Sequence, residues 1–331
     1  MRASTAVAGW LWGRDEPAAG PDPVEGGVRD AVTAYEVLAA HGFAAPEAGL
    51  RVSIVAAGAS RGLLWDGRLA LPAPAHSAAT RLVERVRREL RDGEIGSVEA
   101  AVPAGSAPGG TPFHLAVSVH PLAECVTAQL TTHWDVWLPY DLKGRPQPEV
   151  YAANGPRLAA VLGELAEVLD SETDPDDPTY FAKPTETGAE NFFTADGEAA
   201  DVWRSFEVPR RYDVFTHAPG FGRIGYRRTA EGEVRYLPVE SEHGLLGHLW
   251  ASDGEKAASF EPVNVDDDIV YRAGLVWLER LESAHERGLS PAAAFEELSG
   301  LPDEGGAGRV VTSEPPRTTR LDVLRESADS D

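Results

Sequence analysis

In the stretch LTTHWDVWLPYDL, residues 130–142, every second residue falls on the same side of an extended chain, and the two sides differ in polarity. Leu130 and Trp134 fall on one side of an extended chain, whereas His133 and Asp135 fall on the other. A period of two residues is typical of a half-buried β-strand. The stretch therefore predicts a strand with one face in a core and the other face available for chemistry or contact.

Strand and helix patterns alternate irregularly on both sides of this stretch. The expected strands are 51–57, 68–71, 95–102, 113–120, 126–138, 201–208, 212–217, 223–229, 233–239 and 247–251, and the expected helices are 28–41, 77–91, 154–170, 266–288 and 290–299. Such an order predicts an α+β fold with mixed or antiparallel sheets, helices packed on one face, and two modules.

An acidic, proline-broken run, SETDPDDP at residues 171–178, holds neither a helical nor a strand period. Runs of this composition are typical of linkers. The sequence therefore predicts four parts. These are an N-terminal α+β domain over 1–170, an acidic linker over 171–190, a C-terminal domain of β-hairpins and helices over 191–300, and a flexible tail over 301–331.

The chain has 331 residues and a formal net charge of -23. Binding to a nucleic-acid backbone needs clustered lysine and arginine, so this charge excludes nucleic acid as the main partner. A basic protein would instead be attracted. Only three of the 30 basic residues are lysine, so the acidity also fits the background composition of a GC-rich genome.

Cys125 is the single cysteine, which excludes a disulfide framework and predicts a reducing, cytoplasmic compartment. No apolar run approaches the roughly 18 residues needed to span a bilayer, so no membrane association is expected. The sequence also lacks a glycine-rich phosphate loop, a dinucleotide fingerprint and a zinc signature. We therefore expect neither a cofactor nor a bound metal.

The candidate catalytic residues are His114, His133 and Asp135. Strand 113–120 also alternates, and pairing its apolar face with that of strand 126–138 sets His114 opposite His133. Two imidazoles and a carboxylate can bind a divalent metal, and a histidine oriented by an aspartate can act as a general base. The alternative is a polar sheet face that only contacts solvent, which is ordinary in antiparallel sheets.

Two similar segments, DVWLPYDLKGR at 135–145 and DVWRSFEVPRR at 201–211, combine aromatic residues with arginine. Trp, Tyr and Arg are enriched at protein interfaces. The alternative is aromatic packing at a strand end. The candidate binding residues are Trp137, Tyr140, Asp141, Arg145, Trp203 and Arg211.

These observations predict a cytoplasmic accessory protein, of the scaffold or toxin-neutralising type, that binds a protein partner through an acidic, aromatic-rich surface. A basic partner fits the charge. The alternative is a hydrolase-like enzyme, metal-assisted or general acid/base, centred on His114, His133 and Asp135. A third hypothesis is a small-ligand binding module lined by Trp134 or Trp137.

Overall fold

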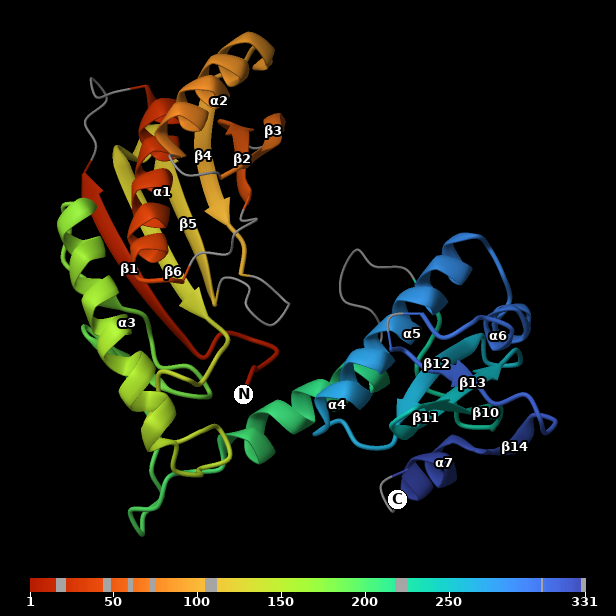
Figure 1. The fold of residues 1–331 in the computed structure, drawn as a ribbon. Helices are drawn as coiled ribbons and strands as arrows, with labels where there is room; N and C mark the ends of the chain where they lie inside the picture. Colours follow the sequence, from red (N-terminus) through yellow and green to blue (C-terminus); the bar gives the residue numbers. More distant parts are fainter. Residues whose placement is uncertain are drawn as a thin grey trace. The chain divides into compact units, whose positions relative to one another are not determined.

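The computed structural model describes residues 1–15, 22–43, 49–58, 62–71, 75–104, 112–217, 225–304 and 306–328. The chain divides into two compact units, Met1–Trp203 and Arg204–Asp331. Each unit combines antiparallel sheet with helices, which confirms the predicted α+β class (Figure 1).

The first unit is built on a seven-stranded antiparallel sheet in the spatial order β3-β2-β4-β5-β6-β1-β7. Its strands are β1 (Ala8–Asp15), β2 (Gly49–Ala56), β3 (Leu63–Ala70), β4 (Ile95–Val102), β5 (Phe113–His120), β6 (Cys125–Thr132) and β7 (Asp174–Pro175). Strand β1, which the sequence pattern did not predict, pairs with β6 along its whole length.

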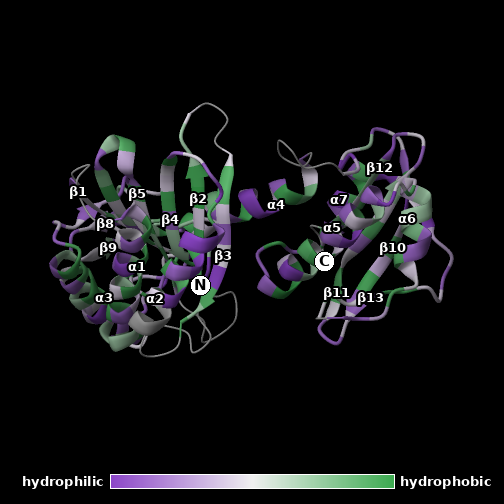
Figure 2. Ribbon diagram, turned by 90° about the horizontal axis from the view of Figure 1, so that it is seen from above, coloured by the Kyte–Doolittle hydropathy of each residue, from purple (hydrophilic) through white to green (hydrophobic). Residues whose placement is uncertain are grey.

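Three helices, α1 (Pro23–Ala40), α2 (Ala75–Glu89) and α3 (Pro148–Val168), complete the core of the first unit. Figure 1 shows α1 and α2 on one face of the sheet. Helix α1 begins where the Asp22 side chain accepts hydrogen bonds from the backbone N–H groups of Val24 and Glu25, an ordinary N-cap. Figure 2 shows how hydrophobic and hydrophilic residues are separated in this unit. Strands β2 and β4 are mainly hydrophobic, and α2 carries large hydrophilic areas.

The predicted strand 126–138 is too long, because β6 ends at Thr132. The Thr132 hydroxyl accepts hydrogen bonds from the Trp134 backbone N–H, at 3.2 Å, and from the Trp137 indole N–H, at 3.0 Å. A turn then closes where the Leu138 N–H donates to the Asp135 carbonyl. Past Thr132 the backbone pairs with the first residues of the chain, through an isolated bridge between Arg2 and Trp134 and a bond from the Ala3 N–H to the His133 carbonyl.

The predicted acidic linker, residues 171–190, instead belongs to the first unit. Strand β7 pairs with β1, and two short strands, β8 (Lys183–Thr185) and β9 (Gly188–Glu190), pair with each other. Acidic composition predicted a solvated linker, but hydrogen bonds to β1 and to Val7, just before it, hold this segment in place. The boundary between the units therefore lies after Trp203.

The second unit packs helices α5 (Asp268–Glu286) and α6 (Pro291–Ser299) against a five-stranded sheet. The sheet contains β10 (Glu233–Ser241), β11 (Gly244–Ser252), β12 (Ala257–Pro262), β13 (Arg309–Val310) and β14 (Arg317–Arg320). The predicted strands 233–239 and 247–251 correspond to β10 and β11, and both predicted helices form. Strand β12 was not predicted.

Two expected strands of the second half are helical. Residues 201–208 contain a π-helical turn (Trp203–Glu207), and residues 212–217 fall within α4 (Val208–Thr216), apart from the cap residue His217. Within the third, 223–229, the described residues 225–229 contain only an isolated bridge from Arg227 to Ala257. The predicted flexible tail also folds, because β14 pairs with β10 and α7 (Leu321–Ala328) buries Leu321 and Leu324.

Candidate functional site

The structure does not bring the three candidate catalytic residues together as predicted. In the β5–β6 hairpin, His114 pairs with Thr131 and Phe113 pairs with Thr132, so the predicted register is wrong by two residues. His133 lies beyond the strand, with its Nδ1 atom 3.3 Å from the Ala3 carbonyl oxygen. Within the described residues, no group of three or more His, Cys, Asp or Glu side chains could hold a metal ion.

Asp135 is fully buried rather than exposed on the polar face of the sheet. Its carboxylate contacts the Met1 ammonium group and accepts a hydrogen bond from the Leu142 backbone N–H at 3.1 Å. Burial raises the pKa of Asp135, although the Met1 ammonium and the Leu142 N–H act in the opposite direction. These contacts make Asp135 an organising residue of the 133–147 turn.

We expect the stability contributed by Asp135 to fall as the pH rises. Because its folded-state pKa lies above the ordinary aspartate value, ionisation favours the unfolded chain between the two pKa values. Asp135→Asn removes this titration, so the difference in unfolding free energy between wild type and variant should change above about pH 4. Urea unfolding across a pH series measures this difference. Parallel pH curves for the two proteins would contradict the expectation.

Most candidate binding residues are buried. Trp137 is 2% exposed and Trp203 is 1% exposed. Trp137 packs with Phe43 and Phe113, with ring centroids 5.3 and 4.8 Å away. The aromatic side chains at these two positions therefore form core rather than contact surface, as the packing alternative stated.

Asp141 and Arg145 build a compact turn in the first unit. The Asp141 carboxylate accepts hydrogen bonds from the backbone N–H groups of Lys143 and Arg145, both at 2.9 Å. The Arg145 guanidinium also binds this carboxylate, with Nε at 2.7 Å. The turn leaves the side chain of Arg145 largely exposed, at 66%.

Arg211 lies in a buried charge network of the second unit. Its guanidinium donates to Glu207 at 2.8 Å, to Asp268 at 2.7 Å and to the Val265 carbonyl at 3.2 Å. Arg211 is 2% exposed and Glu207 is fully buried. With so little of it exposed, this residue holds α4 to α5 and offers little surface to a partner.

The strongest candidate surface lies on residues 171–200, which we call the acidic strap. This segment contains eight acidic residues and one basic residue, Lys183. Seven of the acidic side chains are exposed: Glu172, Asp174, Asp177, Glu186, Glu190, Asp196 and Glu198. Two large aromatic side chains of the strap are also exposed, Tyr180 at 58% and Phe193 at 56%.

The acidic strap is fixed to the first unit by hydrogen bonds from several positions. The Thr179 hydroxyl donates to the Val7 carbonyl at 2.7 Å, and the Trp10 indole N–H donates to the Thr185 carbonyl at 2.9 Å. Phe181, in the middle of the strap, is 1% exposed. Buried anchors at intervals therefore hold the exposed side chains of the strap in defined places.

Tyr140, a predicted binding residue, connects the 133–147 turn to the acidic strap. The Asn191 side chain accepts from the Tyr140 N–H at 3.1 Å and donates to the Tyr140 carbonyl at 2.9 Å. The Tyr140 and Phe193 rings meet edge to face, with centroids 5.9 Å apart. Sequence reasoning found Tyr140 but missed Phe193, whose signal was an aromatic pair, Phe192-Phe193, inside an acidic segment.

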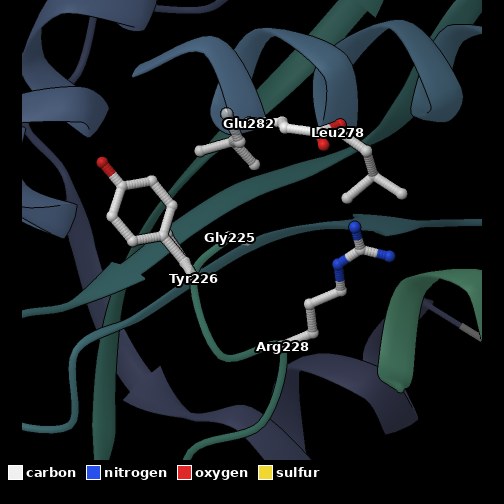
Figure 3. A pocket seen from close by; sticks show the side chains of 7 residues that line it. Gly225, Tyr226, Arg228, Leu278 and Glu282 are labelled. Carbon is white, nitrogen blue, oxygen red and sulfur yellow. The ribbon is translucent and has the colours of Figure 1, made fainter. Parts of the chain in front are cut away.

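A pocket of about 260 Å³ between α1 and α2 is lined by Val28 and Val83 together with charged side chains that include Arg29 and Glu84. One small pocket in the second unit holds about 10 Å³, enough for one water molecule. Figure 3 shows its lining by Tyr226, Arg228, Leu278 and Glu282. A shallow groove of about 590 Å³ beside α5 and α6 is lined by Arg287 and Glu297, which pair with each other at 2.5 Å.

No family model, curated protein or solved structure matches the chain. Among the described residues, no helix combines the length and the apolar character required to cross a membrane.

Proposed function

We propose that the protein is a cytoplasmic accessory protein that binds a basic protein partner through the acidic strap. The observation that carries the proposal is the combination of seven exposed carboxylates with two exposed aromatic rings on a segment of 30 residues. Carboxylates attract lysine and arginine side chains, and aromatic faces bind the same cations through their quadrupoles. The free cysteine, Cys125, is consistent with a reducing compartment.

The anchoring of the strap supports this proposal energetically. A segment that becomes ordered only on binding loses affinity to the entropy of ordering. The strap is held by Thr179, Phe181 and Asn191 before any partner arrives. Its exposed groups are therefore preorganised, and charge steering adds to the rate of association.

We expect the double substitution Tyr180→Ala and Phe193→Ala to weaken partner binding at least about tenfold, because exposed aromatic anchors dominate interface energies. The folded state should change little, since both side chains are more than half exposed. Immobilised wild-type chain would recover the partner from cells of the source organism. Calorimetry with the purified partner would then give the affinity of each variant at low and high salt.

Leu122→Ala provides the matched control, because Leu122 is 64% exposed and lies outside the strap. The control should bind like wild type, and added salt should weaken binding by wild type and control alike. Equal affinity of the strap variant and the control would overturn the proposal. A recovered partner without an excess of lysine and arginine would also overturn it.

A further inference from the structure

Strand β3 forms one edge of the seven-stranded sheet. It pairs with β2 on one side, and no strand in the described ranges lies along its other side (Figure 1). Edge strands present unpaired N–H and C=O groups that can pair with another chain. The opposite edge of the sheet is better protected against pairing, because β7 has only two residues and one of them is Pro175.

The sequence of β3 lacks most of the usual protection of an edge. Its eight residues, LLWDGRLA, include neither proline nor lysine. One register irregularity with β2 lies at its start, near Leu63. Two charged residues, Asp66 and Arg68, stand near its centre on the side away from Trp65, and both are exposed. Two charges of one sign would repel a second copy, but this pair carries opposite signs.

The order of these residues is self-complementary in antiparallel pairing. If two copies of β3 pair about a two-fold axis through Gly67, Asp66 of each copy lies opposite Arg68 of the other. Trp65 then lies opposite Leu69, and Leu64 lies opposite Ala70. Side chains that lie opposite each other project from the same face of a sheet. This register therefore places charge against charge and apolar against apolar.

Gly67, at the position of the axis, leaves room for the Trp65 ring on one face of the strand. An ideal Cβ atom at Gly67 would lie 2.3 Å from the Trp65 ring and 2.8 Å from the Arg85 guanidinium. The Trp65 ring therefore covers the glycine on the helix-bearing face, where Arg85 stacks on it at 5.2 Å. Arg85 also contacts the Arg68 carbonyl, but at 3.5 Å, the long limit of a hydrogen bond.

A second copy would also improve the charge balance within each sheet. Arg51 of β2 lies directly opposite Arg68 of β3, and like charges in this position are destabilising. The Asp66 carboxylate binds the Arg51 guanidinium through two hydrogen bonds, at 2.9 and 3.3 Å. Asp66 of a second copy would add a carboxylate on the open side of Arg68.

We propose that two copies of the chain associate through β3 into a two-fold symmetric dimer with one continuous sheet. The interface is isologous, so each copy contributes the same strand, and closure by the two-fold axis stops further growth. This pairing uses a surface different from the acidic strap, so either inference can fail without the other.

Sedimentation velocity of the full chain tests the proposal across a range of concentrations, at about 0.15 M salt. We expect wild type to show a concentration-dependent monomer–dimer equilibrium. Arg68→Asp places two carboxylates opposite each other in the dimer, and Asp66→Arg places two guanidinium groups there. Each variant alone should dimerise at least about tenfold more weakly than wild type, because like charges oppose pairing.

A mixture of the two variants tests the proposed register most directly. In the mixed dimer, the Arg68→Asp chain contributes a carboxylate at both positions, and the Asp66→Arg chain contributes a guanidinium group at both. Both cross-strand pairs therefore become attractive, and mixing should restore the dimer to within about threefold of wild type. Thermal unfolding of each variant establishes that the fold is intact. The proposal is overturned if wild type stays monomeric, if both charge variants still dimerise, or if folded variants fail to associate when mixed.

Discussion

Replacing Arg211 by methionine is expected to lower the unfolding free energy of the second unit by about 3–5 kcal/mol. Arg211 is 2% exposed and Glu207 is fully buried, so the variant leaves the Glu207 carboxylate in the core without its cation. Asp268, the other carboxylate partner of Arg211, is about half exposed and can be solvated instead. Urea unfolding, followed for the transition of the second unit, measures the loss.

The double variant Glu207→Gln and Arg211→Met is the control for this effect. Replacing both members of a buried ion pair removes the uncompensated charge, and such replacements are often close to neutral. We therefore expect the double variant to recover most of the stability that Arg211→Met loses. If both variants lose the same stability, the cost arises from lost packing of Arg211 against Tyr271, 4.5 Å from the ring centroid, and not from the stranded carboxylate.

Trp137→Ala is expected to destabilise the first unit by about 3–5 kcal/mol, the range for truncating a buried aromatic residue. The Trp137 ring contacts Phe43 and Phe113, and its indole N–H donates to the Thr132 hydroxyl. The substitution removes this packing and also one of the bonds that end β6. Thermal and urea unfolding of the first unit check the prediction.

Trp137→Phe separates the two contributions. It keeps an aromatic ring between Phe43 and Phe113 but removes the hydrogen bond to Thr132, so it should cost clearly less than the alanine variant. An alanine variant with wild-type stability would show that Trp137 is not a core residue. That result would restore the original interpretation of Trp137 as a contact residue.

The alternation of apolar residues was enough to predict β5, β6 and their buried faces, but it did not determine the register. Alternation allows every shift by two residues, because each such shift keeps the same side chains in the core. The observed register depends on the turn. His120 pairs with Cys125 across a short connection in which Glu124 has a positive φ of 51°. Apolar periodicity carries no information about that turn.

The helical segment 203–216 was missed for a different reason. Its buried residues follow a spacing of four, Trp203, Glu207, Arg211 and Phe215, which is a helical stripe. Two of the four are charged, so a pattern search based on apolar residues assigns them to the outside. Their burial is tolerable because Arg211 pairs with Glu207 and also donates to Asp268 and to the Val265 carbonyl. The last two partners are distant in sequence, so apolar periodicity does not reveal them.

The acidic strap illustrates the limit of composition as a guide. Residues 171–178 are rich in proline and aspartate, which is typical of a linker. The sequence therefore predicted no binding role for this part of the candidate surface. Single side chains determine its real position, namely Thr179, Trp10 and Asn191, and each bonds to backbone that is distant in sequence. The predicted contact residue Tyr140 was found because it stood in an aromatic motif.

The two hydrogen bonds between Asn191 and Tyr140 make the acidic strap sensitive to deamidation of Asn191. Slow hydrolysis converts an asparagine amide into a carboxylate, and here the lost N–H₂ group is the donor to the Tyr140 carbonyl, 2.9 Å away. The product would place a negatively charged oxygen against a carbonyl oxygen in a site that is only 6% exposed. An aged molecule would keep the bond from the Tyr140 N–H but lose the bond to the Tyr140 carbonyl, so the connection between Tyr140 and the strap would be weaker.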